Sequence, residues 1–297
     1  MTDKGRPTQL RLGSAPPAPL ERVVNVASVP MRSPFRYPGG KTWLVPIIRQ
    51  WLGSRSPRPR EFIEPFAGGG TVGLTVAFER LADRVLLVEL DDDVAAVWRT
   101  ILCGDAEWLA DKISSFQPTP ESVRDVLEAS HTSVREKAFA TIVRNRVNRG
   151  GILAPGAGLM KLGENGKGLA SRWYPKTLCR RILAIAALRD RIAFVRGDGL
   201  AAMRDDVGRT DVAFFVDPPY VVAGRRLYRH NAVDHERLFQ IASGVRGDML
   251  MSYDDTAHIR ALAARHGFQV KPLPMKTTHH RRKTELVIAR RLDWLGG

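Results

Sequence analysis

Cysteine is scarce in this sequence, and long apolar runs and metal-ligand spacings are missing from it. The two cysteines, Cys103 and Cys179, form no CxxC pair, so neither a disulfide framework nor a structural zinc site is expected. His279 and His280 are adjacent but have no carboxylate at a metal-ligand spacing, so no metal is expected. No apolar run has the length of a membrane span, and the first residues lack the hydrophobic core of a secretory signal. These absences predict a soluble protein of a reducing, intracellular compartment, without a membrane partner.

Positive charge, in contrast, is abundant. Lys and Arg together number 46 against 31 Asp and Glu, which gives a formal net charge of +15 at pH 7 over 297 residues. Such an excess favours a polyanionic partner over a small acidic ligand, and a basic surface without a partner is the alternative. The length suits one large domain with a smaller inserted domain better than two equal halves.

Residues 211–220 read as a buried strand that ends in a stiff turn, Asp217-Pro218-Pro219-Tyr220. Asp217 falls at the carboxyl end of this strand, where open α/β sheets place ligands. The Asp217 carboxylate and the Pro218 carbonyl could accept both N–H hydrogens of an exocyclic amine on a planar base, and the ring of Tyr220 could stack on that base. A rigid turn with a surface tyrosine is the alternative interpretation.

Two glycine segments predict ligand-binding turns earlier in the chain. Residues 35–41, Phe-Arg-Tyr-Pro-Gly-Gly-Lys, precede an amphipathic helix predicted over 42–52, and their glycines leave backbone amides open to a carboxylate or phosphate. Residues 64–70, Glu-Pro-Phe-Ala-Gly-Gly-Gly, lie between a short apolar strand and a helix. The second segment has neither the GKS or GKT ending of a P-loop nor the GxGxxG of dinucleotide enzymes. It therefore predicts a nucleotide-type site without ATP hydrolysis.

Acidic residues follow two more predicted strands. The strand over 84–88 ends in Glu89, roughly 20 residues beyond the glycines, where an acid can receive both ribose hydroxyls of an adenosine moiety. Residues 91–93, all Asp, are better explained as caps of the following helix. The strand over 192–195 is followed by Asp198, which could accept a hydrogen bond from a bound adenine, with a plain turn aspartate as the alternative.

Basic residues mixed with amides and aromatics are typical of the irregular region after residue 102. A helix predicted over 134–143 leads into Arg-Asn-Arg-Val-Asn-Arg at 144–149 and then into a glycine-rich loop. Such residues suit contacts to DNA phosphates and base edges, and a solvated loop is the alternative. The loops 221–231 and 279–283 are also strongly basic. The predicted DNA contacts are Arg144, Asn145, Arg146, Arg149, Arg225, Arg229, Arg281 and Arg282.

Taken in chain order, these motifs resemble those of the Dam-type family of adenine-specific DNA methyltransferases, of the alpha class, over residues 34 to about 291. The family's aromatic-x-Gly-Gly-Lys, Glu-Pro-Phe-x-Gly-x-Gly and Asp-Pro-Pro-Tyr motifs are all present. Tyr37 stands where the best-known members have tryptophan, and Glu89 where aspartate is usual. The resemblance implies catalytic roles for Asp217, Pro218, Pro219 and Tyr220. It implies cofactor-binding roles for Tyr37, Lys41, Glu64, Phe66, Gly68, Gly70, Glu89, Asp198 and Asp217.

The resemblance also implies a fold and an activity. The expected fold is an α/β, Rossmann-like S-adenosyl-L-methionine-dependent methyltransferase sheet with helices on both faces. Residues 1–33 would be a flexible tail, 34–102 and 178–297 the catalytic domain, and 103–177 an inserted, mainly helical and loop target-recognition domain. The expected activity is methyl transfer from S-adenosyl-L-methionine to the N6 amine of an adenine flipped out of double-stranded DNA. The protein would act in the cytoplasm, at the nucleoid, as a monomer. The sequence leaves open whether it has a cognate restriction endonuclease as partner in a restriction-modification setting.

Three other functions remain open. Methylation of the exocyclic amine of cytosine uses the same geometry, although Ser more often replaces Asp in that subclass. An RNA methyltransferase would favour an Asn-Pro-Pro core. A non-enzymatic DNA-binding module would need the basic face, but not the glycine turn, Glu89 and Asp-Pro-Pro-Tyr together.

Overall fold

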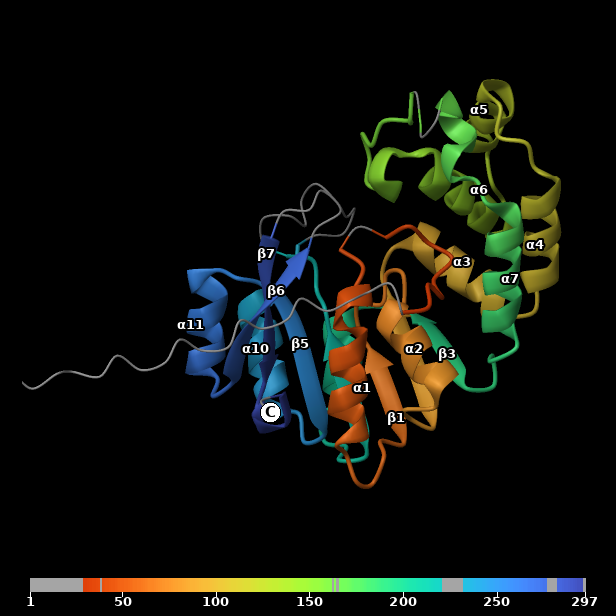
Figure 1. Cartoon of the computed structure of the whole chain (residues 1–297). Coiled ribbons are helices and arrows are strands. Elements are labelled where there is room, and N and C mark those ends of the chain that lie inside the picture. The colour runs from red at the N-terminus through yellow and green to blue at the C-terminus, as the bar shows by residue number, and fades with distance from the viewer. Residues whose placement is uncertain are drawn as a thin grey trace, which may run out of the picture.

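The fold is organised around one seven-stranded sheet in the order β3-β2-β1-β4-β5-β7-β6, seen at the centre of Figure 1. The computed structural model describes residues 29–37, 39–161, 163, 166–220, 232–276 and 282–295. All strand pairs are parallel except those that β7 makes with β5 and β6. The strands are β1 (Glu61–Glu64), β2 (Arg84–Glu89), β3 (Ile192–Arg196), β4 (Val212–Val216), β5 (Asp248–Asp254), β6 (Gln269–Lys276) and β7 (Arg282–Ala289).

The central strands are apolar throughout because both faces of the sheet are covered. All five residues of β4 are buried, as expected for a parallel strand between two layers of helices. Alternate β4 side chains point into two separate cores: Ala213 and Phe215 into one, Phe214 and Val216 into the other. The chain runs from β1 to β2 on one side and reaches β4 on the other, so a topological switch point lies between β1 and β4. Ligands of open α/β sheets bind at such points.

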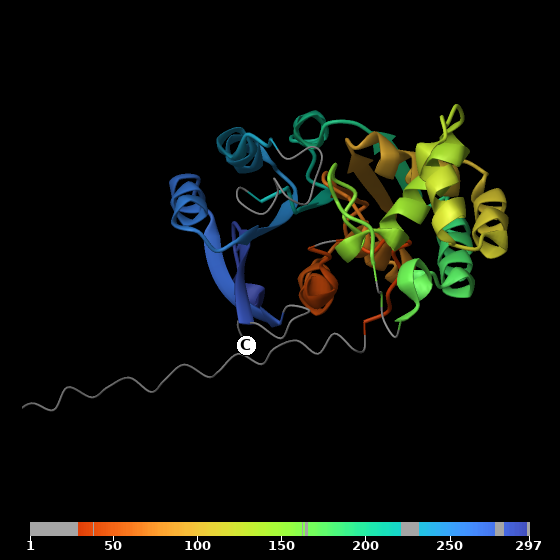
Figure 2. The same cartoon turned by 90° about the horizontal axis from the view of Figure 1, so that it is seen from above.

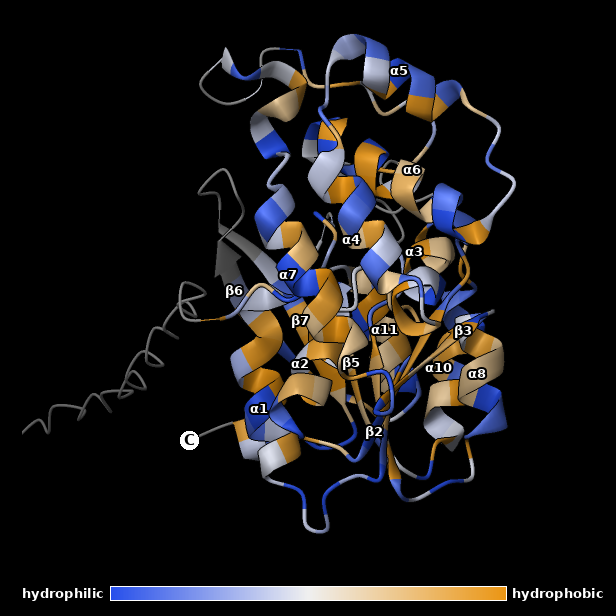
Figure 3. Ribbon diagram, turned by 90° about the vertical axis from the view of Figure 1, so that its right-hand side faces the viewer, coloured by the Kyte–Doolittle hydropathy of each residue, from blue (hydrophilic) through white to orange (hydrophobic). Residues whose placement is uncertain are grey.

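Helices pack on both faces of the sheet, which confirms the predicted fold class. Seen from above in Figure 2, α1 lies on one side of the strands and α10 on the other. Figure 3 shows the apolar residues gathered in the strands and in the helix sides that face them. The helices around the sheet are α1 (Val45–Gly53), α2 (Thr71–Glu79), α3 (Asp92–Leu102), α8 (Gly199–Asp205), α10 (His235–Gly244) and α11 (Ala257–Arg265).

A second group of helices stands beyond the carboxyl ends of the strands (Figure 1). It consists of α4 (Ala106–Ser115), α5 (Pro120–Glu128), α6 (Val134–Val147) and α7 (Pro175–Ala186), with the short 3-10 helices Arg149–Gly151 and Gly168–Arg172. Its apolar side chains belong to the same core as those of α1, α2 and α3. α7 extends beyond the predicted insertion 103–177 and leads into β3, so the proposed boundary at 177 falls inside a helix. The division into domains stays a prediction.

Two smaller features bear on the expectations. Of the predicted tail 1–33, the structure describes residues 29–33, and there Val29 and Ser33 are buried. Asp91 caps α3, because its carboxylate accepts the backbone N–H groups of Asp93 and Val94 at 2.9 and 3.1 Å. This confirms the capping role that was predicted for Asp91.

Within the described ranges, every helix is too short or too polar to cross a membrane.

Candidate active site

A cavity of about 360 Å³ opens at the carboxyl ends of β1, β2 and β4, a volume within the range of small-molecule sites. The sequence predicted a cofactor site from residues that are far apart in the chain, and the structure brings all of them to this cavity. They are Tyr37, Lys41, Glu64, Phe66, Gly68, Gly70, Glu89, Asp198 and Asp217. Of the Asp-Pro-Pro-Tyr motif, Asp217 and Pro219 line the cavity.

The glycine turn before α2 forms one wall of the cavity. Gly68 and Gly70 have φ values of +47° and +62°, a region that other residues rarely adopt. A Cβ atom at Gly68 would lie 2.6 Å from the Tyr37 ring, so that ring packs directly on the turn. The indole of Trp98 donates a hydrogen bond of 2.9 Å to the Gly68 carbonyl. The turn is therefore held in place by Tyr37 and Trp98, and its glycines line the cavity.

Buried carboxylates give the cavity an acidic character. Burial raises the pKa of Glu64 to about 8, against the hydrogen bond of 2.7 Å that its Oε2 accepts from the Gly73 amide. Burial also raises the pKa of Glu89, whose two oxygens accept the amides of Gly68 and Asp91, each at 2.8 Å. Asp198 caps α8 through the amide of Leu200 while lining the cavity. A ligand with positive charge would relieve the cost of burying these acids.

Asp217 is held by three side chains, two of them from other parts of the chain. Lys41 Nζ lies 3.0 Å from Asp217 Oδ2. Ser252 Oγ of β5 donates to Asp217 Oδ1 at 2.7 Å, and the Tyr220 hydroxyl lies 3.3 Å from the same oxygen. Burial raises the pKa of Asp217, and the nearby Lys41 ammonium opposes that shift. The carboxylate is thus oriented before any substrate arrives.

Tyr220 lies behind Asp217 and away from the cavity wall. Its side chain is 9% exposed. Its hydroxyl donates to Glu285 Oε2 at 3.0 Å, its ring stacks on Tyr253 with centroids 6.1 Å apart, and Lys41 Nζ lies 5.0 Å from the ring centroid. The hydrogen bond to Glu285 and the packing on Tyr253 hold the ring in this position. The predicted stacking of the ring on a base stays a prediction.

Asn145 and Arg146 occupy positions at odds with the predicted direct contacts to DNA, because both are buried. The Asn145 amide donates to the carbonyls of Arg36 and Gly151 at 3.0 and 2.7 Å and accepts the Arg36 N–H at 2.9 Å. Arg146 donates to the carbonyl of Pro34. Both side chains satisfy backbone groups, and so they fix the segment that leads to Tyr37 and Lys41.

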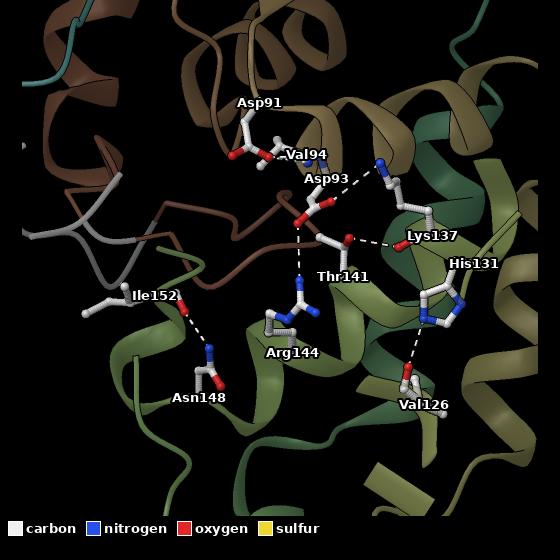
Figure 4. Close-up of polar contacts among 10 residues, drawn as sticks. All are labelled: Asp91, Asp93, Val94, Val126, His131, Lys137, Thr141, Arg144, Asn148 and Ile152. Atoms are coloured by element: carbon white, nitrogen blue, oxygen red, sulfur yellow. Dashed lines mark hydrogen bonds and ion pairs between the residues drawn. The ribbon is translucent and has the colours of Figure 1, made fainter. Parts of the chain in front are cut away.

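The other predicted DNA contacts differ in their surroundings. Arg144 is paired with Asp93 Oδ2 at 3.2 Å, and Lys137 lies 3.8 Å from the other oxygen of that carboxylate, so the side chain of Arg144 joins α6 to α3 (Figure 4). Arg149 is exposed. Arg225, Arg229 and Arg281 lie outside the described residues, and Arg282 is described only by its backbone in β7.

The contact at Gly151 gives a first prediction. Gly151 has a φ of +74°, and a Cβ atom there would overlap the carbonyl oxygen of Arg36. We expect Gly151→Ala to lower the free energy of unfolding by about 1–2 kcal/mol from backbone conformation alone, and further through the overlap. The measurement is urea unfolding.

Gly156→Ala is the matched control, since Gly156 also has positive φ, +84°, but no atom lies within 4 Å of its added Cβ. Equal losses in the two variants would show that the contact with Arg36 is unimportant.

Sequence reasoning missed two residues of the site, Ser252 and Glu285. Both are fully or almost fully buried, at 0% and 3% exposure. Each interrupts an apolar strand: Ser252 follows Met249-Leu250-Met251, and Glu285 precedes Leu286-Val287-Ile288-Ala289. An acid at the start of an apolar strand was a usable signal, because a buried charge is costly unless it has partners.

Comparisons with known proteins show similarity to DNA methyltransferases. Residues 37–142 match the family model described as D12 class N6 adenine-specific DNA methyltransferase. A DNA N-6-adenine-methyltransferase of Escherichia phage P1 is 27% identical over 268 residues, which are 85% of this chain and 34% of that protein. The chain thus spans about a third of the length of this relative.

Solved structures with similar folds include an rRNA methyltransferase, aviRa, of Streptomyces viridochromogenes. It is 14% identical, with 88% of this chain and 90% of that chain covered and a TM-score of 0.38. A methyltransferase from Geobacter sulfurreducens is 12% identical, with 86% and 80% covered and a TM-score of 0.38. Similarity at this level carries no argument about activity.

Proposed function

We propose that the chain transfers a methyl group from S-adenosyl-L-methionine to the N6 amine of an adenine in double-stranded DNA, as its match to the D12 class of N6 adenine-specific DNA methyltransferases over residues 37–142 supports. One arrangement carries the proposal. The Asp217 carboxylate, at the end of β4, opens into the same cavity as the glycine turn and Glu89. A methyl donor held by the turn and an amine held by Asp217 would therefore meet in one space.

The residues of the cavity fit S-adenosyl-L-methionine. This cofactor carries a positive sulfur and a positive amino group, and the cavity is lined by the buried Glu64 and the partly exposed Glu89 and Asp217. The Glu89 carboxylate accepts the backbone amides of Gly68 and Asp91, and a carboxylate has further acceptor capacity for a ribose hydroxyl. The glycine turn lines the same cavity. We propose that Glu89 holds the ribose and Asp198 the adenine of the cofactor.

The chain's own part in the reaction is to bind and orient the amine. Bound S-adenosyl-L-methionine supplies a methyl group that its positive sulfur has already activated. Asp217 and the carbonyl of Pro218 are proposed to accept the two N–H hydrogens of the adenine amine. These hydrogen bonds turn the nitrogen lone pair out of the plane of the ring and towards the methyl group. Positioning of this kind supplies most of the rate enhancement.

Tyr220 is proposed to stack on the adenine after the base leaves the duplex. Base extrusion costs a few kcal/mol, which stacking and hydrogen bonds in the pocket offset. Lys41 and Tyr253 now contact this ring. The proposal therefore requires the ring of Tyr220 to move when the base enters.

DNA is proposed to lie over the carboxyl ends of the strands, beside the second group of helices. Of the predicted contacts within the described ranges, Arg149 is exposed and Arg144 partly exposed, and both are retained. Asn145 and Arg146 are reassigned to holding the backbone of residues 34–36. Action as a monomer at the cytoplasmic nucleoid, and a cognate restriction endonuclease, remain predictions.

The test is to identify the methylated nucleoside. The protein is incubated with duplex DNA and methyl-labelled S-adenosyl-L-methionine, and the DNA is then digested to nucleosides. We expect label in N6-methyldeoxyadenosine, and no competition from RNA of the same sequence. Label in N4-methyldeoxycytidine, or label only in RNA, would replace the proposed substrate.

A further inference from the structure

Five side chains form a polar cluster at the edge of the cavity, which we call the Glu285 cluster: the buried Lys41, Tyr220, Ser252 and Glu285, and the partly exposed Asp217. The Tyr220 hydroxyl lies 3.0 Å from Glu285 and 3.3 Å from Asp217. The Lys41 ammonium lies 3.0 Å from Asp217 and 3.7 Å from Glu285. Two carboxylates therefore share one ammonium and one hydroxyl.

The strand pairing explains how these residues meet. Val216 of β4 is paired with Met251 of β5, so the next residues of the two strands, Asp217 and Ser252, are neighbours. Asp254 of β5 is paired with Glu285 of β7. Because side chains alternate along a strand, Ser252 and Glu285 lie on the same face as diagonal neighbours. The cluster is thus a row across three adjacent strands at their cavity end.

A glutamate at position 285 is expected to destabilise the fold, because its carboxylate is buried. It is 3% exposed, and the four residues after it in β7 are apolar and buried. A carboxylate removed from water destabilises a fold unless its hydrogen bonds are excellent, and apolar replacements of buried ion pairs are often more stable. A carboxylate next to the proposed reaction site is therefore better explained by a role in that site than by stability.

The role of Glu285 follows from a competition between two acceptors, Glu285 and Asp217, for the same hydrogen-bond donor. A hydroxyl has one proton, so the Tyr220 hydroxyl can donate fully to only one of its two acceptors. The shorter distance is to Glu285. The Lys41 ammonium stays nearer to Asp217, at 3.0 Å, than to Glu285, at 3.7 Å. Without Glu285, the Tyr220 hydroxyl would donate fully to Asp217 Oδ1, an oxygen that an incoming amine needs.

We propose that Glu285 is a positioning residue that draws the Tyr220 hydroxyl away from Asp217 Oδ1 and so keeps that oxygen more available to the substrate amine. Ser252 fixes the orientation of the same carboxylate from the other side. This inference rests on the proposed methyl transfer. It assigns to Glu285 no direct contact with the substrate.

The experiment is a double-mutant cycle on Glu285 and Tyr220. Single-turnover methyl transfer is measured at saturating DNA and S-adenosyl-L-methionine for the wild type, Glu285→Gln, Glu285→Ala, Tyr220→Phe and the double variants. Loss of a hydrogen bond to a charged group predicts a decrease of about 10- to 100-fold for Glu285→Ala. Gln keeps an acceptor for the hydroxyl, so Glu285→Gln should recover part of the rate. In the Tyr220→Phe background the effect of Glu285→Ala should shrink at least about threefold, because the two residues share one contact.

Two further readouts separate positioning from folding. S-adenosyl-L-methionine affinity by calorimetry should change less than the rate, and the same cycle on the urea unfolding midpoint should show coupling between residues 220 and 285. Thr284→Ala, an exposed neighbour on the same strand, is the matched control and should keep the wild-type rate. Wild-type rates in both Glu285 variants, or strictly additive effects with Tyr220→Phe, would overturn the assignment. A wild-type protein that methylates no adenine would instead overturn the proposed function, and the unfolding cycle would still decide whether the contact exists.

Discussion

Asp217→Ala is expected to reduce methyl transfer to DNA by on the order of 10²–10⁴-fold, the range for removing a positioned polar group from a reaction site. The carboxylate is the only side-chain acceptor that the Asp-Pro-Pro-Tyr motif offers to an amine in the cavity. Its removal also leaves the Lys41 ammonium with Glu285 as its nearest acidic partner. Binding of S-adenosyl-L-methionine should become weaker but remain measurable, because the glycine turn and Glu89 are unchanged.

Asp217→Asn refines this test. Asn keeps one acceptor oxygen and nearly the same volume, but it loses the negative charge that attracts Lys41 and the amine. We expect a rate between those of the wild type and Asp217→Ala, with the unfolding midpoint of each variant recorded as a control for folding. Methyl transfer at the wild-type rate by Asp217→Ala would remove Asp217 from the mechanism.

The sequence predicts well those structural features that depend on residues close together in the chain. The apolar run of β4 and the glycines at 68–70 follow from rules that act within a few residues, and both lie where expected. Glu89 was predicted at the end of its strand, and the carboxyl ends of parallel strands necessarily meet at one edge. The cavity could therefore be assembled from motifs alone, although its ligands remain proposals.

The parts that were missed depend on contacts between distant segments. Glu285 reaches Tyr220 across 65 positions of the chain, and no local pattern specifies that partner. Asn145 resembles a DNA contact in the sequence because its amide could bind a base edge. Its actual partners are the backbone of Arg36 and Gly151, which periodicity and composition cannot reveal. The composition of a basic, amide-rich segment can thus predict that the segment binds DNA, but it cannot predict which of its residues contact the DNA.

The distribution of charge links surface and site. The chain carries a formal charge of +15, yet its cavity is lined by Glu64, Glu89 and Asp217 with Lys41 among them. A positive surface attracts the polyanionic substrate. Inside, acids favour a cationic methyl donor. The net positive charge therefore suits the proposed DNA substrate, and the acids of the cavity suit the proposed methyl donor.

Glu64→Gln is expected to change how stability depends on pH. Burial raises the pKa of Glu64 from the ordinary 4.5 to about 8. The folded state therefore holds this proton more tightly than the unfolded chain does. The resulting stabilisation is complete below about pH 4.5 and is lost as the pH rises through about 8. For the wild type, the loss from this one group would be at most about 4–5 kcal/mol.

Gln stays neutral and can still accept the amide of Gly73, so the variant should lack this part of the decline. The measurement is the free energy of urea unfolding at several values between pH 5 and pH 9. The pKa values of Glu89 and Asp217 are also raised by burial, so both proteins should lose stability towards high pH, and only the difference between them reports on Glu64. Glu107→Gln, at an exposed position of α4, is the control and should follow the wild type. If the free energy of unfolding depended on pH in the same way in the wild type and in Glu64→Gln, Glu64 would be ionised in the folded protein at neutral pH. The cavity would then carry more negative charge than the raised pKa of Glu64 implies.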